Sequence, residues 1–308
     1  MAGTILLTGA TGQVGRELLR ELAAVSGAAN VLAPGRASLD LSDAASDFRG
    51  LRDTIRNTRP RWIVNPAAYT AVDRAEAEPE AAYAVNALAV QAIGEEAYAL
   101  GAGVIHFSTD YVFDGTKCGP YAETDETAPL NVYGASKLRG EQALAASGAG
   151  HLIFRTSWVY GATGKNFLLT ILKLSREREV LKIVDDQHGA PTWSVDLAKM
   201  TAAVITQCET MARGGALGSV LEQVGGVYHA GGQGATTWRE FAAEAVQQQQ
   251  RREPGVQFAE VQGIASVAYP TPAKRPANSL LDCGRLHDRF GWTMMNWQDS
   301  LSKVLSEL

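Results

Sequence analysis

A tyrosine and a lysine spaced four residues apart could together carry out acid–base chemistry. Residues 133–137 read Tyr-Gly-Ala-Ser-Lys, so Tyr133 and Lys137 would lie one turn apart on the same face of a helix. A phenol has an unperturbed pKa of about 10, and a nearby cation that lowers this pKa makes it a better acid–base catalyst at neutral pH. The spacing favours Tyr133 as a proton donor, although a surface tyrosine packed on a lysine stem would have the same spacing.

A second polar segment could face the same site. Gly103–Ser108 is predicted as a buried strand, and Thr109 and Asp110 follow it directly. The carboxyl ends of strands are where doubly wound sheets place their ligand groups. Thr109 and Asp110 are therefore candidates for contact with a substrate.

A glycine-rich turn near the start of the chain predicts a dinucleotide site. Glycines at positions 9, 12 and 15 would allow a tight turn, close approach to a pyrophosphate and close packing of helix on strand. The N–H groups at the start of the helix would then face the phosphates. A glycine-rich string alone is weak evidence for a dinucleotide site. This one is stronger evidence, because it joins the first predicted strand to the first predicted helix. The cofactor-binding residues expected here are Gly9, Gly12, Gln13, Val14 and Gly15.

The end of the second predicted strand, Val31–Ala33, helps to choose the dinucleotide. An NAD site usually has an acidic residue here for the ribose 2′-OH, whereas an arginine accommodates the 2′-phosphate of NADP. Arg36 stands in this place with no acidic residue beside it. NADP is therefore favoured, and Asp40, a few residues further on, keeps NAD open.

These residues require a scaffold of alternating strands and helices. The predicted strands are Thr4–Thr8, Val31–Ala33, Trp62–Asn65, Gly103–Ser108 and His151–Thr156. The predicted helices are Val14–Val25, Ala45–Asn57, Ala81–Leu100 and one that begins near Tyr133. Alternation of this kind with apolar strands is typical of a parallel sheet covered by helices on both faces. We expect an α/β protein with a doubly wound parallel sheet, a Rossmann fold.

The alternation weakens after Trp158, where glycine and proline become frequent. The segment 269–276 holds three prolines, which disfavour helix at the residues before them. We expect a dinucleotide-binding domain over residues 1–158. Residues 159–308 are expected to form mainly a smaller α/β substrate-binding domain, with some segments returning to the first domain.

Composition excludes several classes of protein. Of 308 residues, 46% are hydrophobic and 20% are charged, which is typical of a globular protein. The formal net charge of −5 argues against a nucleic-acid partner. No apolar run is long enough to span a membrane and the start lacks the features of a signal peptide, so we expect a cytoplasmic protein. Three scattered cysteines predict neither a disulfide framework nor a metal site.

Several motifs in chain order resemble the extended short-chain dehydrogenase/reductases that act on nucleotide sugars. Within that superfamily the chain is similar to the dTDP-4-dehydrorhamnose reductase family, over nearly its whole length. The motifs that carry the resemblance are Gly12–Gly15, Ser108–Phe113, Pro129–Gly134, Arg155–Tyr160, Asp186–Thr192 and Arg275–Ser279.

The resemblance implies roles for individual residues. Tyr133 would be the general acid, Lys137 would hold the nicotinamide ribose and lower the pKa of Tyr133, and Thr109 would be the hydroxyl partner. The segment that lines the cofactor in the family falls on Ala67, Ala68 and Tyr69. Pro66 departs from the usual Asn-Ala-Ala in this stretch and removes a backbone donor beside the cofactor.

The resemblance also implies a reaction. The family reduces the C4 ketone of dTDP-4-dehydro-6-deoxy-L-mannose to dTDP-L-rhamnose with NADPH, as the last step of dTDP-rhamnose biosynthesis. NADH is left open as the cofactor, and so is a homodimer. Some reductases of the family ligate Mg²⁺ at a subunit interface near the position of Glu17. No partner carboxylates are identifiable, so a solvated helix glutamate is favoured there.

Further candidates for substrate binding lie in the second half of the chain. Trp158 follows a strand end and could either stack on a sugar or base or belong to an aromatic core. Arg275 could meet the diphosphate of a nucleotide sugar, and Asn278 lies close to it in the same motif.

Two other functions stay open from the sequence. A sugar-nucleotide 4-epimerase with retained NAD uses the same fold and residues, and Arg36 weighs against it. A non-catalytic NADP-binding regulatory subunit could be built on the same scaffold. The complete set of Thr109, Tyr133 and Lys137 weighs against that function, because binding alone requires no acid.

Overall fold

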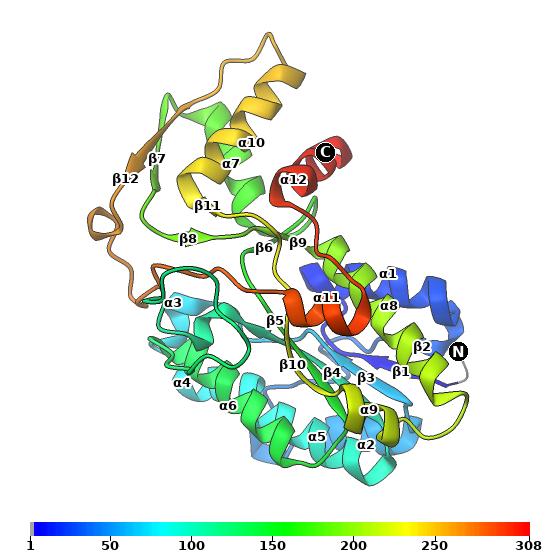
Figure 1. Cartoon of the computed structure of the whole chain (residues 1–308). Helices are drawn as coiled ribbons and strands as arrows, with labels where there is room; N and C mark the ends of the chain where they lie inside the picture. Colours follow the sequence, from blue (N-terminus) through cyan, green and yellow to red (C-terminus); the bar gives the residue numbers. More distant parts are fainter. Residues whose placement is uncertain (1–2) are drawn as a thin grey trace.

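Six parallel strands form the central sheet of the computed structural model, which describes residues 3–308 (Figure 1). Their order across the sheet is β10-β5-β4-β3-β1-β2, and every pairing is parallel. The strands are β1 (Ile5–Leu7), β2 (Val31–Leu32), β3 (Trp62–Asn65), β4 (Gly103–Thr109), β5 (His151–Thr156) and β10 (Gly226–His229). The first five coincide with the predicted strands. The doubly wound α/β fold is confirmed.

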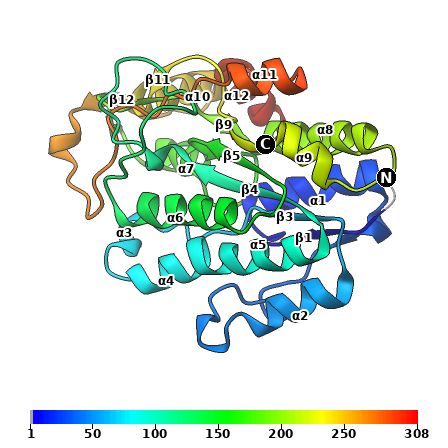
Figure 2. The same ribbon diagram turned by 60° about the horizontal axis from the view of Figure 1, so that its bottom comes forward.

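Helices cover both faces of this sheet (Figure 2). Alternation along β1 separates the two layers, because Ile5 and Leu7 belong to one core cluster and Leu6 to the other. The first cluster holds helices α1 (Gln13–Ser26), α8 (Ser194–Ala212), α9 (Gly218–Val224) and α11 (Gly284–Phe290). The second holds α2 (Arg49–Thr58), α5 (Ala89–Leu100) and α6 (Val132–Ala146). β10, α8, α9 and α11 all come from the second half of the chain.

The helix predicted over Ala81–Leu100 contains a π-helical turn. α4 (Pro79–Tyr83) runs through a π segment (Ala84–Leu88) into α5, and a short helix α3 (Val72–Ala75) precedes them. Asn86, in the π segment, is fully buried and accepts a hydrogen bond from the backbone N–H of Tyr69 at 2.8 Å. Its amide also donates to the hydroxyl of Ser136 on α6, at 3.0 Å. The π turn therefore fixes the loop after β3 against α6.

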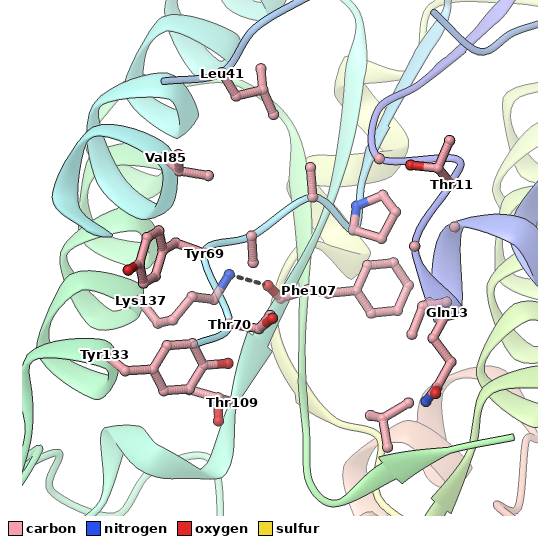
Figure 3. A pocket seen from close by; sticks show the side chains of 18 of the residues that line it. Thr11, Gln13, Leu41, Tyr69, Thr70, Val85, Phe107, Thr109, Tyr133 and Lys137 are labelled. Atoms are coloured by element: carbon pink, nitrogen blue, oxygen red, sulfur yellow. Dashed lines mark hydrogen bonds between the residues drawn. The ribbon is translucent and has the colours of Figure 1, made fainter. Parts of the chain in front are cut away.

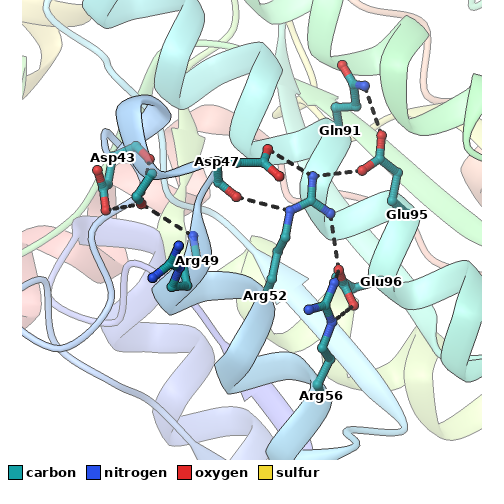
Figure 4. A network of polar contacts seen from close by, with 9 residues as sticks. Asp43, Asp47, Arg49, Arg52, Arg56, Gln91, Glu95 and Glu96 are labelled. Carbon is teal, nitrogen blue, oxygen red and sulfur yellow. Dashed lines mark hydrogen bonds and ion pairs between the residues drawn. The ribbon is translucent and has the colours of Figure 1, made fainter.

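Charged side chains join α2 to α5 (Figure 4). Arg52 donates to Glu95 at 2.8 Å and to Glu96 at 3.1 Å, and Arg56 donates to Glu96 at 2.7 Å. Burial alone would raise the pKa of Glu96, but the hydrogen bonds from Arg56 and Arg52 outweigh it and lower the pKa. These contacts hold the helices together at a distance from the carboxyl ends of the strands.

A buried ion pair fastens α6 to β5. Arg155 donates to Glu141 through Nε at 3.0 Å and through Nη2 at 2.7 Å, and both side chains are 5% exposed. Arg155 also stacks over the Phe113 ring, 5.1 Å from its centroid. The bidentate geometry offsets the cost of removing two charges from water. α6 therefore has one fixed position on the sheet.

The remaining elements form a second lobe on the side of the strands' carboxyl ends (Figure 1). Its helices are α7 (Phe167–Glu177), α10 (Trp238–Arg252) and α12 (Trp297–Glu307). Its paired strands are β7 (Val180–Val184) with β12 (Glu260–Ile264), β8 (His188–Gly189) with β11 (Thr236–Thr237), and β6 (Val159–Tyr160) with β9 (Thr192–Trp193). The proline-rich segment 269–276 contains no helix. No helix within residues 3–308 is long and apolar enough to cross a membrane.

Candidate active site

A cavity of about 1030 Å³ opens at the carboxyl ends of the central strands (Figure 3). The loops after β1, β2, β3, β4 and β5 all line it, and the second lobe adds Gly164, Lys165 and Trp238. β2 lies on one side of β1 and β3 on the other, so the chain reverses its direction of winding there. Open α/β sheets bind ligands at such a reversal.

The glycine-rich turn forms one end of the cavity. Gly12 caps α1 without a side chain, and its own N–H bonds to the Gly9 oxygen at 2.9 Å. A Cβ atom at Gly15 would collide with that oxygen, so only glycine allows the helix to start this close to β1. The first N–H groups of α1 thus face the cavity without competing side chains. This cradle fits a dinucleotide pyrophosphate.

Arg36 lies in the loop after β2, on the wall of the same cavity. Its side chain is 81% exposed, with Nε 3.6 Å from an Asp40 carboxylate oxygen and Nη2 3.4 Å from the Ser42 hydroxyl. Hydrogen bonds from Ser42, and to a smaller extent the charge of Arg36, lower the pKa of Asp40. Arg36 and Asp40, the two residues that the sequence analysis connected with NADP and NAD respectively, thus lie next to each other.

The start of α6 presents Tyr133 to the cavity. The Asn131 side chain caps this helix by accepting the N–H of Gly134 at 2.8 Å. A Cβ atom at Gly134 would collide with the backbone oxygen of Tyr111, so glycine allows the helix to touch the turn after β4. The Tyr133 ring packs edge-on against Tyr111 at 5.6 Å between centroids. Tyr133 and Thr109 consequently lie side by side, as Figure 3 shows.

The electrostatic environment of Tyr133 differs from the expectation. Burial raises the pKa of Tyr133 to about 12, and a hydrogen bond with Thr109 opposes this while the Asp110 charge adds to it. The lowering of this pKa by Lys137, which the resemblance implied, is absent, because the lysine Nζ is directed to β4 instead. The phenol therefore stays protonated at neutral pH, as a proton donor requires.

Lys137 is deeply buried, at 1% exposed, yet it lines the cavity. Its Nζ donates to the backbone oxygen of Phe107 at 2.6 Å and lies 3.2 Å from Nε2 of His106. Burial lowers the pKa of Lys137 to about 8, and the charge of Glu141 partly opposes that shift. A modest change in its surroundings would therefore alter its charge near neutral pH.

Thr109 and Asp110 form a polar pair at the end of β4. The Thr109 hydroxyl donates to Oδ1 of Asp110 at 3.0 Å and accepts the N–H of Tyr111 at 3.2 Å. Oδ2 of Asp110 is buried without a hydrogen-bond partner. Burial raises the pKa of Asp110 to about 6, against the hydrogen bonds it receives. An unpartnered carboxylate oxygen on the cavity wall fits a ligand hydroxyl.

The loop after β3 runs along the cavity as expected, with Pro66, Ala67, Ala68 and Tyr69 among its lining residues. Asn86 holds this loop through both backbone polar groups of Tyr69, at 2.8 Å and 3.1 Å. Pro66 interrupts neither contact.

Trp158 takes part in an aromatic stack rather than in a closed core. Its ring stacks on Trp238 with centroids 3.6 Å apart and planes inclined by 13°, and both residues line the cavity. Its backbone adopts a left-handed φ of 47°, which is unusual for a bulky residue and is found at functional sites. Trp238 is the first residue of α10, so the stack connects the second lobe to the end of β5.

The structure does not bring Arg275 and Asn278 into the cavity wall. Arg275 is paired with Asp73, at 3.0 Å from Nη1 to Oδ1 and 2.7 Å from Nη2 to Oδ2. The Asn278 amide donates to the backbone oxygens of Lys117 and Gly119, at 2.9 and 2.7 Å. Both side chains are thus engaged in holding loops together.

The position at which the family resemblance allowed a Mg²⁺ ligand, Glu17, pairs with Arg20 at 3.0 Å. Residues 3–308 contain no cluster of three or more His, Cys, Asp or Glu suited to a metal.

Comparison with known proteins identifies the family. A family model described as the RmlD substrate binding domain matches residues 3–308. The dTDP-4-dehydrorhamnose reductase of Escherichia coli strain K12 is 45% identical over 306 residues, covering 99% of this chain and 97% of that protein. The chain belongs to the dTDP-4-dehydrorhamnose reductase family. The enzyme of the same name from Burkholderia thailandensis is 44% identical over 99% of this chain and 98% of that protein.

Solved structures of the family have the same fold. The Bacillus anthracis dTDP-4-dehydrorhamnose reductase, solved in complex with NADP, superposes with a TM-score of 0.85 at 30% identity, over 100% of both chains. The Clostridium acetobutylicum reductase gives a TM-score of 0.85 at 33% identity over 99% of both chains.

Several residues that shape the site were missed by sequence reasoning. Lys165 and Trp238 reach the cavity only because the second lobe folds back on the sheet. Asn86 lies within a helical pattern and gave no signal there. His106 lies within β4, and the structure places it against Lys137.

Proposed function

We propose that this chain is an NADPH-dependent oxidoreductase that reduces dTDP-4-dehydrorhamnose to dTDP-L-rhamnose. The observation that carries the proposal is the meeting of the Tyr133 and Thr109 hydroxyls beside Lys137, in a cavity whose far end is the glycine-rich turn. Membership of the reductase family gives the substrate class. The NADP complex of a relative at 30% identity supports the cofactor.

The reaction adds a hydride to C4 of the sugar and a proton to the oxygen that becomes an alkoxide. NADPH, when bound, supplies the hydride. A proton donor must lie within hydrogen-bond reach of the alkoxide oxygen, and Tyr133 and Thr109 offer two hydroxyls at one point. Burial keeps Tyr133 protonated, with its pKa raised to about 12, until an alkoxide, a stronger base, takes the proton. The Lys137 ammonium, one turn along α6, would stabilise the phenolate that remains if its Nζ turned from β4 toward the ring.

The cofactor is held by groups at the other end of the cavity. The N–H groups at the start of α1 would hold the pyrophosphate, and the loop from Pro66 to Tyr69 would line the middle of the cofactor. Lys137 would hold the nicotinamide ribose through an N–H that neither Phe107 nor His106 receives. Asp110 would bind a hydroxyl of the sugar nucleotide, and Trp158 would stack on it.

The assay that tests the proposal follows the absorbance of NADPH in the presence of the dTDP-keto-sugar. We expect oxidation of NADPH that depends on this substrate and is absent with UDP-sugars. A purified protein that retains NAD and turns over without added cofactor would instead be an epimerase. A protein that binds NADPH but never oxidises it would be a regulatory subunit.

We also propose that the protein works in the cytoplasm and forms a homodimer. Sedimentation velocity tests the homodimer.

Arg36 should decide the preference between NADPH and NADH. Removing its guanidinium in Arg36→Ala should weaken NADPH binding by about 1.5–3 kcal/mol, because a charge-assisted contact to the 2′-phosphate is lost. NADH lacks this phosphate and should bind nearly as before. Fluorescence titration of both cofactors checks this, and equal losses for the two would show that Arg36 points elsewhere.

Arg275, which pairs with Asp73 in this structure, is proposed to meet the diphosphate of the substrate. Arg275→Ala should raise the KM for the sugar nucleotide about tenfold, equivalent to about 1.4 kcal/mol, and leave NADPH affinity unchanged. Asp73→Asn is the matched control, because it removes the pairing carboxylate and keeps the guanidinium. It should not raise this KM. Equal increases in both variants would show that the ion pair only positions the loop.

A further inference from the structure

Four buried polar side chains link the lysine of the site to the glycine-rich turn. Nζ of Lys137 lies 3.2 Å from Nε2 of His106, and Nδ1 of that ring lies 3.1 Å from Nδ2 of Asn65. The Thr8 hydroxyl lies 2.5 Å from Oδ1 of Asn65. All four residues are at most 1% exposed. The chain of contacts crosses β4 and β3 and ends beside β1, at the residue before Gly9.

The groups that hydrogen-bond to the Lys137 ammonium are uncharged. The carboxylate one turn further along α6, Glu141, is already engaged by Arg155 in a bidentate pair. Within residues 3–308 the hydrogen bonds of Nζ go to the Phe107 backbone oxygen and to the His106 ring. His106 is therefore the one side chain placed to accept a hydrogen bond from the ammonium. Burial lowers the pKa of His106 well below its usual range, so the ring is neutral and has a lone pair to offer.

The donor and acceptor roles along this chain are coupled. An ammonium can only donate, so Nε2 of His106 must be unprotonated and the ring proton must sit on Nδ1. That Nδ1–H requires an acceptor, which the amide oxygen of Asn65 provides when the amide turns by half a rotation. The structure has the amide nitrogen facing the ring. In that orientation Nδ1 accepts, Nε2 carries the proton, and Lys137 must be a neutral amine. After the half rotation the Thr8 hydroxyl, which now donates to the amide oxygen, accepts from the amide nitrogen instead. The orientation of Asn65, the tautomer of His106 and the charge of Lys137 thus change together.

We propose that His106 is a positioning residue for the reduction, which keeps Lys137 protonated by accepting its hydrogen bond, with Asn65 selecting the tautomer that can accept. The inference rests on the proposed function in one respect, the participation of Lys137 in the reduction. His106 does not line the cavity and acts through Lys137 alone.

The direction of the pH effect follows from the surroundings of Lys137. Besides each other, the charged groups that act on the pair are Glu141 on α6, which opposes the lowering of the Lys137 pKa, and His151 on β5, which adds to the lowering of the His106 pKa. Burial already lowers the pKa of Lys137 to about 8. Removing the acceptor of the ammonium lowers the Lys137 pKa further. Activity that needs the ammonium is lost as pH rises through this pKa. In a variant without the acceptor, activity is therefore lost at a lower pH than in the wild type.

Three substitutions at His106 test the acceptor role. In His106→Gln the amide reaches the position of Nε2 and can still accept from Lys137. In His106→Asn the amide reaches only the position of Nδ1, and His106→Phe keeps the ring shape without any acceptor. We expect the basic limb of the kcat profile to move down by about one to two pH units in the Asn and Phe variants, the value of a hydrogen bond to a charged group. The Gln variant should stay within a few tenths of a unit of the wild type.

His229→Phe controls for loss of a buried histidine. His229 is also fully buried on the sheet, and its Nδ1 lies 2.9 Å from the Tyr121 backbone oxygen, away from Lys137. This variant should lower the unfolding temperature without moving the basic limb. The same profile in His106→Asn as in the wild type, or equal shifts in His106→Asn and His106→Gln, would overturn the proposal.

A readout without turnover separates this inference from the proposed function. The ¹³C chemical shift of Lys137 Cε reports its protonation in the ligand-free protein, and Lys137→Met identifies the signal. The Lys137 pKa should fall in His106→Asn and stay near the wild-type value in His106→Gln. If the protein fails to oxidise NADPH with the dTDP-keto-sugar, the proposed function fails while this titration still tests His106. An unchanged Lys137 titration in His106→Asn would contradict the inference whatever the activity.

Discussion

Replacing Tyr133 with phenylalanine should lower kcat by about 10²–10⁴-fold, the usual contribution of a general acid. The substitution removes one hydroxyl from a buried ring and keeps its edge-on contact with Tyr111. The fold and the binding of NADPH should therefore stay close to those of the wild type. Stopped-flow measurement of NADPH oxidation gives the rate, and cofactor titration gives the affinity.

Tyr111→Phe is the matched control for this prediction. Tyr111 lines the same cavity, but no hydrogen bond joins its hydroxyl to Thr109 among the contacts of residues 3–308. Its substitution should cost far less in kcat. Near-wild-type turnover by Tyr133→Phe would remove Tyr133 from the mechanism, and equal losses in the two variants would point to packing of the ring pair rather than to proton transfer.

Glu141→Ala should lower the free energy of unfolding by about 3–5 kcal/mol, because it leaves the Arg155 guanidinium buried without its carboxylate. Nη1 of Arg155 is already buried without a partner, so this side chain has no alternative acceptor nearby. α6 carries both Tyr133 and Lys137, so loosening it should reduce turnover as well. Urea unfolding at equilibrium measures the change in stability.

Two further variants separate the buried charge from a general loss of contacts. Glu177→Ala removes an exposed ion pair with Lys173 on α7 and should change stability by no more than about 1 kcal/mol. The double variant with Arg155→Met and Glu141→Leu should recover most of the stability, since a hydrophobic pair of similar volume avoids the buried charge. A loss in Glu141→Ala no greater than in Glu177→Ala would contradict the prediction.

Local patterns carried most of the fold prediction. The strands β1, β3, β4 and β5 are short runs that are buried on both faces and rich in apolar residues, so their positions could be read from consecutive residues. The glycine spacing at Gly9, Gly12 and Gly15, and the helical spacing of Tyr133 and Lys137, are likewise local. Backbone clearance and helix periodicity impose them on neighbouring residues, whatever the rest of the chain does. β10 was missed as a strand because it pairs with β5, where Gly226 lies opposite Leu152, 74 residues earlier in the sequence.

Charge partners and distant neighbours were decided by the tertiary structure alone. Nothing in the sequence near Arg275 indicates that Asp73 holds it, and nothing near Trp158 indicates that Trp238 stacks on it. The lowering of the Lys137 pKa likewise follows from burial against β4 rather than from its spacing to Tyr133. Local sequence was enough to show the tight glycine turn at Gly9–Gly15 and the shared helix face of Tyr133 and Lys137. Burial and pairing depend on segments brought together by packing, so only the folded chain decided which of these groups carries a proton.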